Sequence, residues 1–444
     1  MKHRLFFKFL VPFLTFLSVQ PRIALCQESI EKIISEYSKE SIIREINNAE
    51  WLVYSNPGYC DFSKIVLGNT YIDILRLPEN VISVADFEIS GGRVYLCGML
   101  NTGKAYMGYF ELSYFPYSSL IYFEIPNIVN VKKLEVLPAS NTESNPLCQV
   151  IMTGIDDRGI GFIIDAVPSS ASWDVYKIHT YHPDYFDPIY EDIAIVKKYI
   201  VITSCDCPYV YDELDEETKC TGTLWYFIKP ATPTTPLIYS QKKARSLHYV
   251  PTSPFLIAKC EDSTFVTATQ SAVGDIYTSE FSGLNITGTA ILHTDTNVLM
   301  DFTYNHTSHS TEIVVDNIGY QCHESSIYTI YPPMYILSGT AGGIKFPKYT
   351  LNSLRYLNHN IQHFIGSGYY NSNYSDLFLF HYYNNSIVQE CAEVISIETS
   401  PLEKGITQRP FYWYYSSTNQ INPEITETIR KGTDKETICG DLKK

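Results

Sequence analysis

Residues 85–112 read ADFEISGGRVYLCGMLNTGKAYMGYFEL and contain three short strand-like runs in succession. The first has the form apolar-x-apolar, the second is rich in β-branched and aromatic residues, and the third alternates aromatic with aliphatic residues. Gly91 and Gly92, between the first two runs, fit a hairpin turn. The stretch therefore predicts an antiparallel unit of at least three strands.

The same three-part pattern recurs along the chain. Copies begin near residues 87, 134, 193, 258, 302 and 354, with a mean spacing of about 53 residues. A fourth strand-like run precedes each copy, as YIDILRL does before the first. Repeats of this length with four strands each are typical of β-propeller blades, which gain a continuous core by stacking around an axis. We therefore predict an all-β β-propeller with six blades. Seven is the alternative if runs near both chain ends complete another blade.

The N-terminal residues 1–26 have the order of a secretory signal peptide, with basic residues, an apolar run and small residues before the cleavage point. The apolar run is too short and too interrupted to span a membrane as a helix. We expect export to the periplasm, the cell surface or the medium, with Gln27 as the new N-terminus and no transmembrane segment in the mature chain. Lipidation of Cys26 is the alternative, although Leu25 is bulkier than a lipobox normally has at that position.

The remaining segments divide at changes of pattern. Residues 27–60 carry apolar side chains at three- and four-residue spacing, which predicts a short N-terminal helical lead-in. We assign residues 61–400 to the propeller domain. Residues 401–444 are rich in Lys, Glu and Thr and are predicted to form a polar tail, with at most one closing strand.

The composition limits the partners. A net charge of −15 and a pI near 5.2 argue against binding to a phosphate backbone, so no nucleic-acid partner is expected. Tyrosine is abundant, at 36 residues, and suits both strand surfaces and wet binding faces. The mature chain would keep ten cysteines, and Cys207 with Cys220 is the candidate disulfide across an acidic insertion. Cys205 is the rival partner for Cys220.

The segment ADFEISGGRVYLCG followed by AYMGYFEL resembles a signature, DFxI…VYFCG…GYF, of uncharacterised secreted propeller-like proteins of gut Bacteroidota. The resemblance is clearest at Asp86, Phe87, Tyr95, Cys97, Gly98, Gly108 and Phe110. It implies a bacterial periplasmic or surface setting and carries no activity with it. In such a setting the Asn-x-Ser/Thr sequences would not be glycosylated.

The motifs of several enzyme classes are missing from the sequence. It contains no Gly-x-Ser-x-Gly elbow, no His-Glu-x-x-His pair and no phosphate-binding glycine loop. We therefore predict no cofactor, no metal and no catalytic residues.

The most suggestive segment is HTYHPDYFDPIYED, residues 179–192, which concentrates rings and carboxylates in a long connection between blades. Stacking on a sugar and hydrogen bonding to its hydroxyls would use the candidate ligand-binding residues Tyr181, His182, Asp184, Tyr185 and Tyr190. The alternative is that Pro183 and Pro188 stiffen a loop whose aromatic rings pack beneath it.

These observations favour a non-catalytic binding or scaffold protein, acting as a monomer, that presents propeller loops to a glycan, a peptide or an envelope partner. The alternative is a propeller enzyme acting on glycans, with carboxylates from different blades at the central channel. A third possibility is a purely structural role. Convergence of two or more carboxylates in one axial pocket would favour the enzyme.

Overall fold

The computed structural model describes most of the chain, and the statements below concern these described residues. They are 29–33, 40–46, 49–56, 59–65, 71–138, 147–169, 172–181, 187–206, 221–230, 232, 234–247, 252–259, 264–271, 274–294, 297–305, 309–318, 323–330, 339–347, 349–357, 363–370, 377–383, 393–401, 406–407 and 411–439. This part of the chain is all-β and contains only two short 3₁₀ turns, η1 (Leu112–Tyr114) and η2 (Leu237–Tyr239). It has no helix of the length and apolarity needed to cross a membrane.

The strands form antiparallel units of four, which we number along the chain. Unit 1 contains β2 (Glu40–Ile46), β3 (Ala49–Asn56), β4 (Tyr59–Ile65) and β5 (Tyr71–Arg76). Unit 2 contains β6 (Val81–Ser90), β7 (Arg93–Leu100), β8 (Ala105–Glu111) and β9 (Leu120–Glu124). Unit 3 contains β10 (Asn130–Leu137), β11 (Gln149–Ile155), β12 (Gly161–Pro168) and β13 (Trp173–Tyr181). Unit 4 contains β14 (Ile189–Val196), β15 (Tyr199–Asp206), β16 (Thr221–Ile228) and β17 (Lys242–Leu247).

The last three units follow the same plan. Unit 5 contains β18 (Thr252–Lys259), β19 (Thr264–Gln270), β20 (Ile276–Ser282) and β21 (Asn285–Leu292). Unit 6 contains β22 (Asn297–Asn305), β23 (Ser310–Ile318), β24 (His323–Ile330) and β25 (Gly339–Pro347). Unit 7 combines β26 (Tyr349–Leu357), β27 (His363–Tyr370) and β28 (Leu377–Tyr383) with β1 (Ser29–Ile33) from the other end of the described chain.

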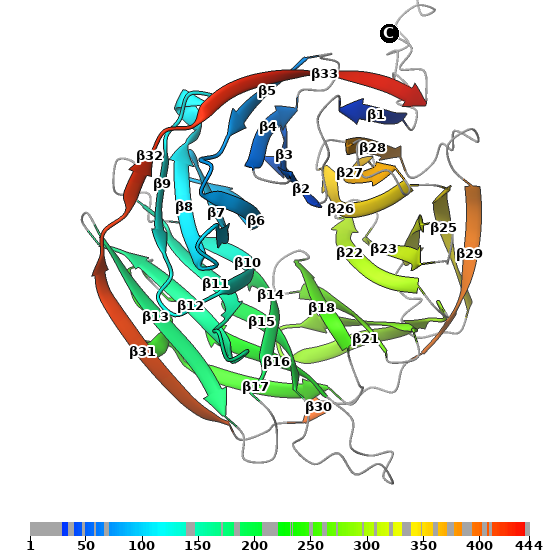
Figure 1. Ribbon diagram of the computed structural model, residues 1–444. Coiled ribbons are helices and arrows are strands. Elements are labelled where there is room, and N and C mark those ends of the chain that lie inside the picture. The colour runs from blue at the N-terminus through cyan, green and yellow to red at the C-terminus, as the bar shows by residue number, and fades with distance from the viewer. Residues whose placement is uncertain are drawn as a thin grey trace, which may run out of the picture.

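The units are arranged in a ring (Figure 1). The first strand of each unit is innermost, and these strands, β2, β6, β10, β14, β18, β22 and β26, contact one another in that order. Strand β26 of unit 7 also contacts β2 of unit 1, which closes the ring. Seven inner strands therefore surround one axis.

The C-terminal strands form what we call the belt: β29 (Glu393–Ser400), β30 (Ile406–Thr407), β31 (Tyr412–Ile421), β32 (Glu424–Thr426) and β33 (Ile429–Cys439). The belt follows the outside of the ring in the order opposite to the units (Figure 1). Strand β29 pairs with β25 and β21, and β30, β31 and β32 pair with β17, β13 and β9. Strand β33 pairs with β5 and then with β1. The belt therefore covers an outer edge in every unit.

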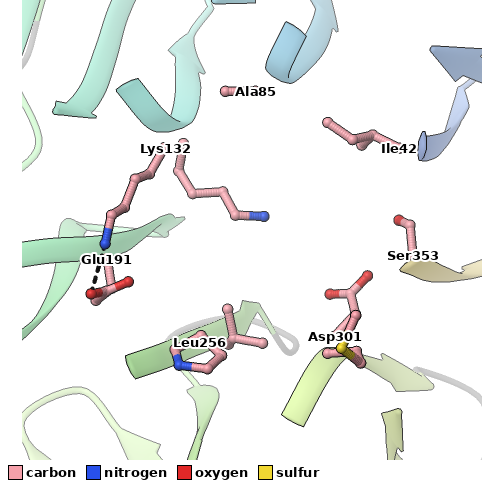
Figure 2. Close-up of a pocket in the computed structure, with 10 residues that line it drawn as sticks. Ile42, Ala85, Lys132, Glu191, Leu256, Asp301 and Ser353 are labelled. Atoms are coloured by element: carbon pink, nitrogen blue, oxygen red, sulfur yellow. Dashed lines mark hydrogen bonds and ion pairs between the residues drawn. The ribbon is translucent and has the colours of Figure 1, made fainter. Parts of the chain in front are cut away.

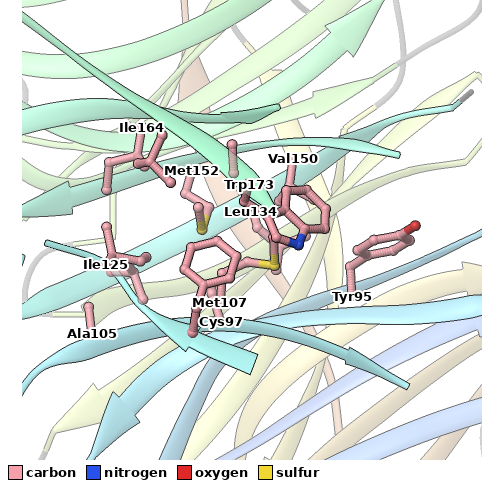
Figure 3. Packing of buried hydrophobic residues seen from close by; sticks show 14 of the residues in the cluster. Tyr95, Cys97, Ala105, Met107, Ile125, Leu134, Val150, Met152, Ile164 and Trp173 are labelled. Atoms are coloured by element: carbon pink, nitrogen blue, oxygen red, sulfur yellow. The ribbon is translucent and has the colours of Figure 1, made fainter. Parts of the chain in front are cut away.

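The core lies between neighbouring units. Between units 2 and 3, Cys97 and Met107 face Val150 and Met152, with Trp173 packed beside them (Figure 3). All five side chains are at most 1% exposed. Similar clusters lie between the other neighbouring pairs from unit 1 to unit 6, so units 2–5 bury both faces against their neighbours, as the stacking of repeats requires.

The residues that carry the family resemblance are structural. Phe87, Tyr95, Cys97 and Phe110 are 0% exposed. Gly98 lies under the irregular part of β6, where an added Cβ would come within 2.0 Å of the Ser83 carbonyl oxygen. These residues of the signature therefore serve the packing of a unit.

The helix predicted within residues 27–60 is wrong. Its described part forms β1, β2, β3 and the start of β4, and Ile43 is 0% exposed in a strand. The spacing of the isoleucines matched a helix, but isoleucine is β-branched and favours strands when partner strands are available. The partners of β1 lie at residues 377–383 and 429–439, too distant to be recognised from local pattern.

The preference for six repeats is also wrong in number, because the described strands form seven units. The three strands of each predicted copy are the first three strands of units 2–7, but the run placed before a copy, such as YIDILRL in β5, is the fourth strand of the preceding unit. The missing copy is unit 1, which begins in the segment taken for a helix. The polar tail at 401–444 was expected to hold at most one strand, but β30, β31, β32 and β33 lie within it.

Candidate functional site

A cavity of about 240 Å³ lies on the axis of the ring (Figure 2). Every inner strand contributes to its lining, which consists of Ile42, Ala85, Lys132, Lys133, Glu191, Pro254, Leu256, Met300, Asp301 and Ser353. We call this the axial pocket. It combines two ammonium groups, two carboxylates and a hydroxyl with several apolar side chains, a mixture typical of small-molecule sites.

One position recurs in all seven inner strands and is occupied by Ile42, Asp86, Lys133, Asp192, Leu256, Asp301 and Ser353. In units 2–7 the pairing with the second strand shifts register at or just before this position. Such β-bulges redirect side chains and leave a backbone group without its ladder partner. The N–H of the following residue must therefore find another acceptor.

In alternate units an aspartate provides this acceptor, and its two carboxylate oxygens accept two backbone N–H groups. One carboxylate oxygen of Asp301 accepts the Phe302 N–H at 2.9 Å, and the other accepts the Leu354 N–H of unit 7 at 2.9 Å. Asp192 bonds Ile193 and, in unit 5, Ile257 in the same way, both at 2.9 Å. Each aspartate thus holds its own bulge and the bulge of the next unit.

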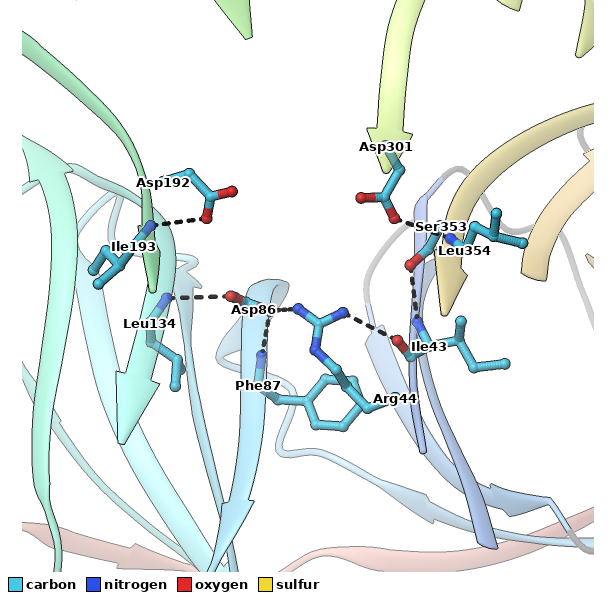
Figure 4. A network of polar contacts seen from close by, with 10 residues as sticks. All are labelled: Ile43, Arg44, Asp86, Phe87, Leu134, Asp192, Ile193, Asp301, Ser353 and Leu354. Carbon is cyan, nitrogen blue, oxygen red and sulfur yellow. Dashed lines mark hydrogen bonds and ion pairs between the residues drawn. The ribbon is translucent and has the colours of Figure 1, made fainter. Parts of the chain in front are cut away.

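Asp86 repeats the arrangement between units 2 and 3, accepting the N–H groups of Phe87 at 3.0 Å and Leu134 at 3.2 Å (Figure 4). In unit 7 the equivalent residue is Ser353, whose hydroxyl oxygen accepts the Ile43 N–H of unit 1 at 3.4 Å. Three aspartates therefore join the units in pairs, and one serine joins unit 7 to unit 1. We call these four residues the clamps.

Charges around the axis are largely compensated. Arg44 forms an ion pair with Asp86, and Lys132 forms one with Glu191 at 2.8 Å. Burial raises the pKa of Asp192 to about 6, and the positive charge of Lys133 opposes this shift. The carboxylates are thus held by backbone amides and cations rather than left available as free acids or bases.

Lys133 differs from the other charged residues of the pocket. Among the described residues its ammonium group makes no hydrogen bond and no ion pair, although it lines the cavity. An ammonium group carries three donors. Lys133 can therefore offer them to a ligand without breaking an existing contact.

The five residues proposed from sequence are not brought together within the described structure. Tyr181 lies at the end of β13, at the outer edge of unit 3, and is 37% exposed. Tyr190 is 0% exposed, and its hydroxyl bonds that of Thr180 at 2.8 Å, so it belongs to the core. His182, Asp184 and Tyr185 lie outside the described residues.

The candidate disulfide cannot be compared, because Cys207 and Cys220 also lie outside the described residues. Cys205, the rival partner, carries a free thiol whose pKa is raised by burial. Within the described residues no three His, Cys, Asp or Glu side chains are grouped closely enough to hold a metal ion.

Sequence reasoning missed the axial pocket residues, especially Lys132, Lys133 and Glu191. A signal was present: an aspartate directly precedes the start of alternate repeats, at Asp86, Asp192 and Asp301. Read as one recurring position, it would have placed all three on the axis. No protein-family model matches this chain, and no curated protein is significantly similar to it.

Proposed function

We propose that this chain is an exported, non-catalytic binding protein built as a seven-bladed β-propeller, whose axial pocket binds a small neutral polar group such as the terminal sugar of a glycan. The observation that carries this proposal is the Lys133 ammonium, which has no bonding partner in the described part of the chain and lines a pocket whose carboxylates are already engaged. The signal-like residues 1–26 and the resemblance to secreted proteins support the export.

The balance of charge favours a neutral ligand. The lining of the pocket itself carries two cations, Lys132 and Lys133, and two carboxylates, Glu191 and Asp301. Neither an anion nor a cation would therefore gain much from net charge. A sugar hydroxyl can accept a hydrogen bond from Lys133 and donate one to a carboxylate oxygen. Its C–H face can pack on the apolar lining, which includes Leu256 and Met300.

The enzyme alternative has one specific observation in its favour. Glu191 and Asp301 line the same pocket, and the pKa of Asp192 is raised to about 6, as acid catalysts often require. Against it, both oxygens of Asp192 and of Asp301 accept backbone N–H bonds, and Glu191 is paired with Lys132. Moving a proton would disturb the contacts between units. Binding without turnover therefore agrees better with the geometry.

Isothermal titration calorimetry of the purified protein with glucose, galactose, mannose and N-acetylglucosamine tests the proposal. We expect at least one sugar to bind and Lys133→Met to weaken that binding at least tenfold. Lys133 makes no bond within the described structure, so the variant should fold normally, as circular dichroism would verify. Lys104→Met is the matched control, because Lys104 is an exposed lysine on unit 2.

The outcomes separate the alternatives. Absence of binding by every sugar would contradict the proposed ligand, as would equal losses in Lys133→Met and Lys104→Met. Release of reducing ends from oligosaccharides, followed over hours, would replace the proposal with the enzyme alternative.

A further inference from the structure

Exposed aromatic rings gather on the outer edge of unit 3, where β13 pairs with the belt strand β31. Tyr181 lies directly opposite Tyr412, and His179 lies directly opposite Tyr414. Alternate residues of a strand point to the same face of a sheet, so these four rings share one face. The exposed fractions of Tyr181, Tyr412 and Tyr414 are 37%, 61% and 55%.

His179 links rings from three strands. His179 stacks on Tyr414 with ring centroids 6.1 Å apart and an angle of 30° between the planes. On its other side His179 contacts Phe162 of β12, at 5.7 Å between centroids. We call Tyr181, His179, Tyr412 and Tyr414 the tyrosine platform. Held by paired strands, its rings lose little freedom when a ligand covers them.

Among the described residues, the cations near the platform are already engaged. Burial lowers the pKa of His179, so its ring is neutral near pH 7. Arg158, whose charge helps to lower the pKa of His179, forms an ion pair with Asp156 at 2.8 Å. The Lys177 ammonium donates to the Pro126 carbonyl oxygen at 3.0 Å and lies over the Phe162 ring. Beside the platform Asp187 brings a carboxylate 3.7 Å from His179, and the whole chain carries −15. This charge opposes an anionic ligand but suits hydroxyl groups that donate hydrogen bonds.

We propose that the tyrosine platform is a second binding surface, for a neutral polysaccharide chain whose sugar rings stack on Tyr412, Tyr414 and Tyr181. Tyrosine rings provide broad apolar contact together with a polar hydroxyl, which matches the two faces of a sugar ring. The platform lies on the outer edge of a unit, whereas the axial pocket lies among the inner strands. The two sites therefore do not depend on each other.

Affinity electrophoresis in gels containing starch, xylan or galactomannan tests the platform. We expect at least one polysaccharide to retard the protein and Tyr412→Ala with Tyr414→Ala to reduce the apparent affinity at least tenfold. Tyr415→Ala is the matched control, because Tyr415 is 67% exposed on the same strand but points to the opposite face. Lys133→Met should leave retardation unchanged, which separates the platform from the axial pocket.

Three outcomes would overturn the proposal. The first is absence of retardation by all three polysaccharides, and the second is an equal loss in Tyr415→Ala. The third is sedimentation showing that the protein self-associates through the platform and that the double variant is monomeric, because the occupant would then be a second copy of the chain.

Discussion

At the scale of single residues, the clamps explain why aspartate recurs at the start of alternate repeats. A bulge in each inner strand of units 2–7 leaves an N–H without a ladder partner, and one carboxylate with two oxygens can serve two such groups. The three aspartates join units 2–7 in pairs, which leaves unit 1 over. The Ser353 hydroxyl oxygen accepts the Ile43 N–H of that unit and closes the series between unit 7 and unit 1.

Replacing a clamp should destabilise the fold without removing any apolar core. Asp301→Ala leaves the Phe302 and Leu354 N–H groups without their acceptor, so we expect the free energy of unfolding to fall by roughly 2–4 kcal/mol. Urea denaturation measures this change. The exposed Asp157, in a turn of unit 3, is the control, and Asp157→Ala should change stability by less than about 0.5 kcal/mol. Equal effects of the two substitutions would contradict the role of the clamp.

Buried carboxyls predict how stability depends on pH. Burial raises the pKa of Asp165 and of Glu312 to about 7, and that of Asp192 to about 6. The folded state therefore keeps protons that the unfolded chain has lost above about pH 4. The free energy of unfolding should decrease as the pH rises from 5 to 8, because each group must then be ionised while buried.

Urea denaturation at pH 5, 6, 7 and 8 checks this dependence. Asp165→Asn removes one of the groups and should make the decrease shallower, whereas Asp157→Asn should leave it unchanged. A free energy of unfolding that rises over this range would contradict the interpretation.

At the scale of strands, the belt is the feature that sequence reasoning described least well. The strand-like run CAEVISI, residues 391–397, lies mostly in β29. Strands β30 to β33 fall in a segment whose polar composition favours a loose tail. The side chains of β31 and β32 are largely exposed, so these two strands lack the alternating burial that marks a strand in sequence. They are strands because the outer edges of the units offer unpaired backbone groups.

Removing β33 should loosen strands far away in the sequence. Strand β1 has five residues and lies between β28 and β33, so it would keep one neighbour instead of two. In a chain that stops after Thr428, we expect hydrogen exchange of β1 and β5 amides to accelerate at least tenfold. Exchange in β11, inside unit 3, is the internal control and should not change. Unchanged protection of β1 and β5 would show that the belt contributes no stability there.

At the scale of the whole molecule, repetition made the fold partly predictable. The all-β class is confirmed, and the six predicted repeats correspond to units 2–7, because each carries its own strand pattern and turns. Unit 1 has no clamp aspartate, and its isoleucines have the spacing of a helix. The repeat was therefore not recognised in this unit. Unit 7 needs β1 from the distant N-terminal part, which local periodicity cannot reveal.

Apart from the recurring aspartate, the axial pocket was unpredictable for a related reason. Each of its other lining residues looks ordinary in its own strand, and only closure of the ring brings all seven strands to one cavity. The tyrosine platform likewise joins Tyr181 to Tyr412, which is more than 200 residues away. Sequence indicated Tyr181 as a contact residue but gave no means of finding its partners.

The closure of unit 7 by β1, which also pairs with β33, has a consequence for folding during synthesis of the chain. A ribosome releases residues 29–33 early, yet their second neighbour is the last strand to emerge. Strand β1 therefore lacks both of its partner strands, β28 and β33, until most of the chain has been synthesised. A product cut short would keep open strand edges that invite aggregation. Chains that stop before β33 would therefore expose unpaired strand edges and aggregate, whereas chains that include β33 would not.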